Sequence, residues 1–206
     1  MPRADLHDWL RTVLKISPAD ATLAALTQQH SSLTRFANNT IHQNVAETQS
    51  HLMVRVEIEA RRGLATTTQL TEEGVRSAVD RACELARHSP AVADRPSLPG
   101  PQHYPVIARW DGPTAAATPQ ERGERVARAI RLAANARLMA AGYLATSSAT
   151  TALADSSGMA ASYPSTFAEF ALTVMGADSS GWAKAKAPAL SELPIEQLTE
   201  QAIRTT

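Results

Sequence analysis

The sequence predicts an α+β protein in which antiparallel strands alternate with amphipathic helices. Apolar and mostly charged side chains alternate from Leu52 to Glu59, and this period of two is typical of a strand with one buried face. Apolar side chains recur every three to four residues after Thr71 and again after Thr118, as in helices that bury one stripe. We therefore expect helices packed on the faces of antiparallel sheets.

Signals before this strand predict two helices and a hairpin. Residues 6–13 place Leu6, Trp9, Leu10 and Val13 on one helical face. Ser17-Pro18-Ala19-Asp20 combines a capping serine, a proline and an acidic side chain, so we expect a second helix to start there. Asn38-Asn39 separates two β-prone runs, and because asparagine tolerates left-handed dihedral angles, the pair predicts a tight turn.

The segment that follows residues 52–58 predicts a turn, a returning strand and a helix. Gly63 is expected to mark the turn, and Leu64–Gln69 has the composition of a strand. Thr71 is expected to cap the helix, with acidic side chains in its first turn. The expected buried stripe consists of Val75, Ala78, Val79, Ala82, Leu85 and Ala86.

The second half begins after a proline-rich stretch. Repeated prolines predict that residues 89–117 form a linker or an irregular arm. Thr118 and Glu121 form a capping box, and the helix that follows is expected to end at Gly142. Near the carboxyl end, Pro194 begins a helical pattern that no Gly or Asn cap closes. We therefore expect the chain to be part of a longer protein.

The pattern of the first half recurs in the second. The offset that separates Leu52 from Phe170, in two strands of alternating character, also separates Gly63 from Gly181. Because strand, glycine and flanking helices recur in the same order, we infer a duplicated unit of helix, antiparallel strands and helix. The expected organisation is a first repeat at 1–88, the linker or arm at 89–117 and a second repeat at 118–206, all in one amino-terminal domain.

Composition restricts the classes of function. Twenty basic and twenty acidic side chains cancel, so no broad electrostatic attraction to nucleic acid or anionic membrane is expected. The chain shows neither a signal peptide nor an apolar run long enough to span a bilayer, and we expect a soluble, cytoplasmic protein. The single cysteine, Cys83, can form no internal disulfide and is interpreted as a small buried hydrophobe.

The sequence shows no recognisable set of catalytic residues. The six histidines form no H-E-x-x-H or H-x-x-x-H pair, and His42 and His51 are expected to face solvent or form hydrogen bonds. The Asp155–Gly158 segment lacks the G-x-S-x-G pattern of serine hydrolases and is interpreted as a turn. The recurrence of arginine every third residue favours a solvated helix face over a phosphate site; these are Arg122, Arg125, Arg128 and Arg131.

Two segments resemble the TldD/PmbA family. The first runs from Thr34 through Asn38-Asn39 to Thr68 and on to the helix near Arg87. The second runs from Asp155 to Thr166 and continues to Gly181-Trp182-Ala183, and it resembles the PmbA (TldE) branch more than the TldD branch. The resemblance implies the amino-terminal domain of a longer protein from a family linked to metallopeptidases and once described as modulating DNA gyrase.

The resemblance also implies partners, a cofactor and a role. TldD-type subunits carry zinc on an H-E-x-x-x-H motif in their carboxy-terminal domain, and no residue here matches it. The expected partners are a TldD-type subunit or a second copy, together with peptides or unfolded segments as substrates. A possible peptide or interface role is implied for the matching turns, with Asn38, Asn39, Asp155, Ser157, Gly158 and Tyr163.

Two other functions stay open at this point. One is a stand-alone binding or adaptor module without an enzymatic link. The other is a small-molecule enzyme that uses the turn residues between Asp155 and Ser165.

Overall fold

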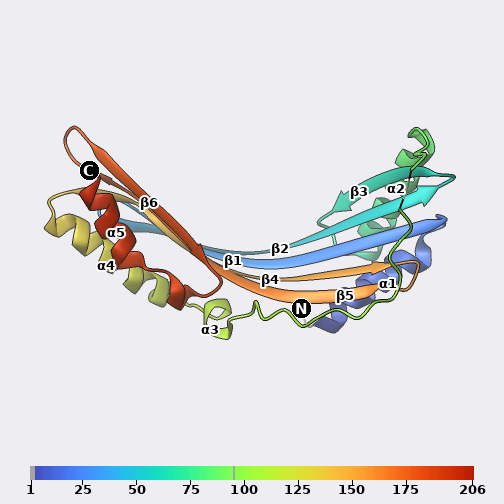
Figure 1. Ribbon diagram of the computed structural model, residues 1–206, viewed down its shortest axis with the longest axis horizontal. Coiled ribbons are helices and arrows are strands. Elements are labelled where there is room, and N and C mark those ends of the chain that lie inside the picture. The colour runs from blue at the N-terminus through green and yellow to red at the C-terminus, as the bar shows by residue number, and fades with distance from the viewer. Residues whose placement is uncertain (1–2, 95) are drawn as a thin grey trace. The chain divides into compact units, whose positions relative to one another are not determined.

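The protein has an α+β fold in which two similar sets of helices and strands follow one another (Figure 1). The computed structural model describes residues 3–94 and 96–206. The first set comprises α1 (Arg3–Ile16), β1 (Ala21–Ala37), β2 (Thr40–Ile58), β3 (Arg61–Thr67) and α2 (Glu72–His88). The second comprises α3 (Gly112–Ala115), α4 (Pro119–Asn135), β4 (Met139–Asp155), β5 (Ala160–Met175), β6 (Ser180–Ala187), a 3-10 turn (Leu190–Glu192) and α5 (Ile195–Arg204). The predicted fold class is confirmed.

The strands form one six-stranded sheet in the order β3-β2-β1-β4-β5-β6. The register of its outer hairpins repeats: Val56 lies opposite Gly63 in β2 and β3, and Val174 lies opposite Gly181 in β5 and β6. The two glycines therefore occupy equivalent positions, as the duplicated pattern predicts.

The chain forms two compact units, and long strands contribute to both. The first unit consists of residues 1–29, 49–107 and 150–164, and the second of residues 30–48, 108–149 and 165–206. Because β1, β2, β4 and β5 each supply residues to both units, the units differ in composition from the sequence repeats at 1–88 and 118–206. The repeat boundaries at 1–88 and 118–206 are defined by the sequence pattern alone, and they stay a prediction.

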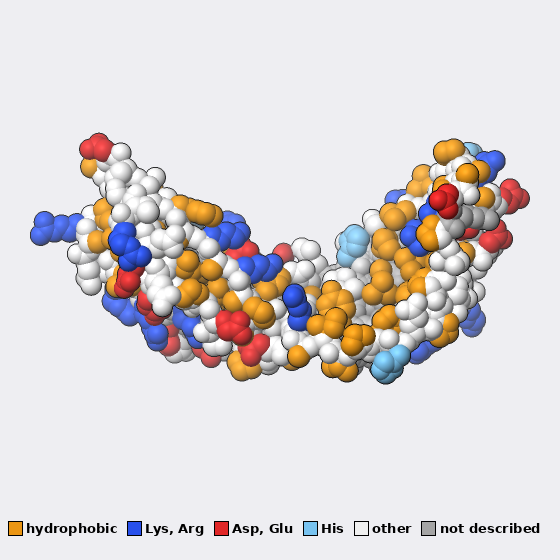
Figure 2. Space-filling model, viewed as in Figure 1, with side chains coloured by type: hydrophobic (Ala, Val, Ile, Leu, Met, Phe, Trp, Pro, Cys, Tyr) orange, Lys and Arg blue, Asp and Glu red, His pale blue; other side chains and the backbone are white. Residues whose placement is uncertain are grey.

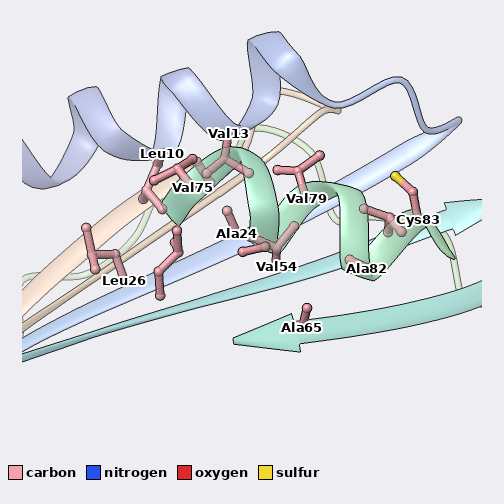
Figure 3. Packing of buried hydrophobic residues seen from close by; sticks show 14 of the residues in the cluster. Leu10, Val13, Ala24, Leu26, Val54, Ala65, Val75, Val79, Ala82 and Cys83 are labelled. Carbon is pink, nitrogen blue, oxygen red and sulfur yellow. The ribbon is translucent and has the colours of Figure 1, made fainter. Parts of the chain in front are cut away.

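The core of the first unit lies between the two helices α1 and α2 and the strands beneath them (Figure 3). The predicted face of α1 is buried at Leu6, Leu10 and Val13, and Trp9 packs half-buried against the same cluster. The predicted stripe of α2 is wrong at Leu85, which is 46% exposed, whereas Cys83 lies inside. Burial raises the pKa of the Cys83 thiol, which fits an unreactive core residue.

The core of the second unit lies between α4, α5 and the strands they cover. Val126 and Ala129 of α4 pack with Phe170 and Leu172 of β5. The rings of Phe36 and Phe170 stack, with centroids 6.3 Å apart. The side chains that alternate with these buried ones in β4, β5 and β6 belong to the opposite face, which is turned away from α4 and α5 and which we call the helix-free face.

Three predicted end signals are confirmed. Asn38 and Asn39 have φ values of 51° and 57°, as expected for the two central residues of a tight hairpin turn. Thr71 accepts a hydrogen bond from the Gly74 backbone N–H at the start of α2. Thr118 and Glu121 form the complete capping box of α4.

The helix predicted to start at Ser17 is absent, because β1 begins at Ala21. Side chains at Thr22, Ala24 and Leu26 are buried alternately, so the core requires a period of two in this segment. The Ser17 hydroxyl forms a hydrogen bond of 2.7 Å with the Thr22 hydroxyl instead of capping a helix. Tertiary burial therefore overrides a favourable local start signal.

Neither Gly63 nor Gly142 occupies the predicted turn or helix end. The β2–β3 turn consists of Glu59 and Ala60, whose φ values are 49° and 66°. Gly142 lies within β4, where an added Cβ would be 2.2 Å from the Ala171 carbonyl oxygen. Both glycines permit close approach inside the fold and do not reverse the chain.

One arginine of the predicted solvated face is buried. Arg122 is 1% exposed and donates hydrogen bonds to the Ala117 carbonyl at 2.7 Å and to Thr34 and Thr146. Burial lowers its pKa because the charged form loses hydration. The solvated interpretation is therefore wrong for Arg122.

Candidate functional site

A polar cavity of ≈ 390 Å³ lies within the first unit. Its walls come from the start of β1, the hairpin of β2 and β3, the proline-rich arm and the β4–β5 turn. Its charged lining consists of Asp20, Arg55, Glu57 and Arg62, and we call this cavity the Arg55 pocket. It is the candidate site because charged groups from separate parts of the chain converge there.

The strand pattern explains why Arg55 and Glu57 line this pocket. Leu52, Val54 and Val56 of β2 are buried against the core that includes α1 and α2. The residues that alternate with them belong to the opposite face of the strand, turned away from α1 and α2. The alternation that buries one face of β2 in the core therefore also places Arg55 and Glu57 on the pocket side.

Two of the four charged groups are paired with each other. Arg62 Nε donates to Glu57 Oε2 at 3.2 Å, and these residues face each other in the β2–β3 register. Asp20 Oδ2 accepts the backbone N–H of Glu59 at 2.9 Å. Among the described residues, no acceptor or ion-pair partner of the half-buried Arg55 side chain is found. Arg55 thus lines the pocket, and its guanidinium group has no partner within residues 3–94 and 96–206.

The β4–β5 turn supplies hydroxyl groups at Ser156 and Ser157. Asp155 Oδ1 accepts the backbone N–H groups of Ser157 at 2.8 Å and Met159 at 3.0 Å. Gly158 has φ 96°, a conformation that other residues rarely adopt. These bonds and this geometry hold the two serines in place.

The Ser156 side chain is engaged as an acceptor. Its Oγ accepts the Thr22 backbone N–H at 3.0 Å, while its own backbone N–H donates to the Thr22 carbonyl at 2.9 Å. The hydroxyl proton of Ser156 is not used in either bond. Ser156 can therefore donate a hydrogen bond into the Arg55 pocket.

The structure brings three of the predicted site residues together in the β4–β5 turn. They are Asp155, Ser157 and Gly158, and of these Ser157 lines the Arg55 pocket. Tyr163 lies in β5 of the same unit, is 42% exposed and does not belong to the pocket lining.

Asn38 and Asn39 belong to the second unit. The Asn39 amide donates to the Leu138 carbonyl at 2.9 Å and accepts the Ala140 N–H at 2.7 Å. These bonds give Asn39 a structural role at the start of β4. The peptide or interface roles of these residues stay predictions.

Sequence reasoning missed Arg55 and Glu57 as site residues. Their signal was the charged face of the alternating strand, which is equally typical of a face in contact with water. The local sequence does not distinguish a strand face that lines a pocket from one that contacts water, because the other walls of the pocket come from distant segments.

Asp155 leaves one buried oxygen without a partner. The residue is 2% exposed, and Oδ2 has no hydrogen-bond partner in the described part of the chain. We expect Asp155→Ala to lower the free energy of unfolding by about 1–3 kcal/mol, because two backbone N–H groups lose their acceptor. Asp155→Asn should cost less, since it keeps an acceptor and removes a buried charge. Urea denaturation checks both; equal losses for Asn and Ala would contradict this account.

The second unit carries a separate cross-strand network on the helix-free face. The Tyr143 hydroxyl donates to Glu169 Oε1, and Lys184 Nζ lies 2.8 Å from the same oxygen. The bonds from Lys184 and Tyr143 lower the pKa of Glu169, and the bond to Glu169 raises the pKa of Tyr143. Lys186 Nζ lies 3.7 Å from the ring centroid of Phe167.

The described residues provide no obvious metal centre. No group of three or more His, Cys, Asp or Glu side chains in residues 3–94 and 96–206 is placed to hold a metal ion. His42 and His51 are both exposed, as expected for side chains that face solvent.

Lys and Arg side chains are interspersed with Asp and Glu on the face shown in Figure 2. No helix in the described residues has the length and hydrophobicity required for a membrane span.

The fold and the site define a duplicated α+β domain with a helix-free sheet face. Residues 24–86, from β1 to α2, match the family model described as PmbA/TldA metallopeptidase domain 1. This match confirms the predicted relationship to the TldD/PmbA family, whose first domain the chain carries over these residues. No curated protein sequence matches the chain significantly.

Solved structures of longer proteins share this fold. TldE from Thermococcus kodakarensis has a TM-score of 0.79 and 17% identity, over 98% of this chain and 46% of that chain. A candidate modulator of a DNA gyrase from Thermotoga maritima has a TM-score of 0.78 and 14% identity, over 97% and 47% of the two chains. A candidate modulator of DNA gyrase from Bacteroides thetaiotaomicron has a TM-score of 0.77 and 14% identity, over 97% and 48%. The chain spans about half the length of these structures.

Proposed function

We propose that this chain is the amino-terminal, substrate-enclosing scaffold of a TldD/PmbA-type metallopeptidase subunit in the cytoplasm, closer to the PmbA/TldE branch. Its substrates are peptides or unfolded segments, and its partner is a TldD-type subunit or a second copy. The family match over residues 24–86 and the half-length likeness to TldE support the assignment. The observation that carries the enclosing role is the helix-free face of the sheet.

The helix-free face has properties suited to binding an extended peptide. In the second unit, α4 and α5 cover the side of β5 that buries Phe170 and Leu172. On the other side, Trp182 is 61% exposed in β6, next along that face to Lys184. An extended peptide can pack on such a face or add to the edge strands β3 and β6 through main-chain hydrogen bonds.

The described residues contain no cluster of three or more side chains suited to zinc. From the resemblance to the TldD/PmbA family, the proposal places zinc in the carboxy-terminal domain of a catalytic partner, where it would activate water. This chain would contribute binding and enclosure of the substrate.

The test combines the protein that contains this chain with a TldD-type subunit, zinc and an unfolded peptide. We expect cleavage that stops when a chelator removes the metal. An uncut peptide, with both subunits folded and zinc present, would contradict the proposal. Binding of unfolded peptide without cleavage by any such pair would instead favour the adaptor function.

Trp182→Ala tests the helix-free face directly. Because Trp182 offers a large exposed ring and no catalytic group, we expect a several-fold higher KM with kcat unchanged. Leu85→Ala is the matched control, because Leu85 is also an exposed apolar side chain but lies on α2. Equal effects of the two substitutions on KM would argue against substrate contact at this face.

A further inference from the structure

We propose that the Arg55 pocket binds a carboxylate group of a peptide. The first argument is the state of its charged groups. Glu57 is paired with Arg62, and Asp20 accepts a backbone N–H, while Arg55 has no acceptor among the described residues. A guanidinium group presents a planar fork of donors that matches the two oxygens of a carboxylate.

The second argument is the set of hydroxyl donors on the facing walls. Ser97 comes from the proline-rich arm, and Ser156 and Ser157 come from the β4–β5 turn. The Ser156 oxygen already accepts a backbone N–H, and its hydroxyl proton remains available to donate. The pocket therefore combines one charged fork with neutral donors, as a bound carboxylate requires.

The balance of charge favours a carboxylate over a phosphate. The formal charges of Arg55 and Arg62 are cancelled by Asp20 and Glu57. Any bound anion therefore meets two nearby carboxylates as well as the Arg55 guanidinium, and a monoanion meets less of this repulsion than a dianion does.

The walls of the pocket also suit a peptide as the carrier of the carboxylate. Leu23, Pro96 and Leu98 add apolar surface to the lining. A volume of ≈ 390 Å³ is near the lower end of ligand pockets and would accommodate a short end or a single side chain. The carboxylate would thus be either the terminus of a peptide or an Asp or Glu side chain. The choice of a peptide as carrier rests on the proposed function, but recognition of a carboxylate does not.

The experiment uses the full chain and fluorescence anisotropy with three labelled peptides of one core sequence. One ends in a free carboxylate, one ends in an amide, and one ends in an amide but contains an internal Glu. We expect tighter binding of at least one carboxylate peptide than of the neutral amide. A preference for the first identifies the terminus as the ligand, and a preference for the third identifies the side chain. Equal affinity for all three overturns the proposal.

Substitutions then assign the binding to Arg55. Arg55→Gln should weaken binding of the preferred peptide at least tenfold, and Arg55→Lys should restore it only in part because lysine lacks the fork. Arg76→Gln, an equal change of charge at an exposed position on α2, should leave affinity unchanged. Circular dichroism and Tm identify variants that remain folded. A folded Arg55→Gln variant that binds like the wild type overturns the proposal.

Competition by small anions checks the ligand class. Acetate should displace the preferred peptide from the wild type, and inorganic phosphate should do so less effectively at equal ionic strength. Stronger competition by phosphate would overturn the assignment of a carboxylate. Cleavage by the complete peptidase without any preference for carboxylate peptides would remove this inference and leave the proposed function standing. Carboxylate binding without cleavage would support this inference and count against the proposed function.

Discussion

Gly63→Ala should lower the free energy of unfolding by about 3 kcal/mol, at the upper end of the usual cost of overpacking. A Cβ added at Gly63 would lie 1.9 Å from the Ala82 carbonyl oxygen and 2.5 Å from the Ala86 backbone nitrogen. Both atoms belong to the backbone of α2, so no side-chain rotation can relieve the clash. The helix would have to move away from β3, and the packing between them would loosen.

Gly181→Ala should have a similar effect in the second unit. There the added Cβ would lie 1.9 Å from the Ala202 carbonyl oxygen of α5. Gly123→Ala is the matched control, because its Cβ would meet only Ile41 Cδ1 at 3.9 Å and alanine is a better helix former than glycine. We expect the control to gain up to about 1 kcal/mol. Chemical denaturation measures all three variants; small losses at Gly63 and Gly181 would show that the helices can shift at little cost.

Arg122→Ala should destabilise the protein by about 2–4 kcal/mol. The side chain fills buried space beneath α4, and its hydrogen bonds join the Ala117 carbonyl to hydroxyl groups of β1 and β4. Its loss would leave a cavity and buried polar groups without donors. Arg122→Met should cost less than Ala, since methionine retains much of the volume and removes a poorly hydrated charge.

The control for Arg122 comes from the same helix. Arg131 is exposed on α4, so Arg131→Ala should change the free energy of unfolding little. Denaturant midpoints and slopes for the three variants separate a change in stability from a change in cooperativity. If Arg122→Ala behaved like Arg131→Ala, the buried hydrogen bonds of Arg122 would not contribute appreciably to the fold.

Local signals were sufficient where a residue type has a specific backbone role. Asn38-Asn39 forms its turn, and Thr118 with Glu121 forms its capping box. These residues bond or bend the chain within a few positions, so their effect is readable in a short window. The alternation of Leu52, Val54 and Val56 was equally clear, since one face of the strand is buried.

Signals failed where distant packing decides the outcome. Ser17-Pro18 resembles a helix start, but the burial of alternate residues from Thr22 onward requires a strand. Gly63 resembles a turn residue, but its role is to admit the backbone of α2. In both cases the local sequence permits two structures, and a contact with a remote element selects one.

The candidate site shows the same division. The turn at Asp155 to Gly158 could be predicted, because Asp, Ser and Gly are ordinary turn residues. The pocket beside it could not, because Arg55, Ser97 and Ser157 lie far apart in sequence and converge only in the folded first unit.

The sequence by itself determined the α+β class, the repeated order of helix, strands and helix, and the turn and capping residues. All of these depend on interactions within a few residues or on a regular period. Only the tertiary structure decided which glycines admit a helix, which arginine of α4 is buried and which side chains line the Arg55 pocket. These properties depend on the surroundings of each side chain, and those surroundings come from segments that local patterns do not connect.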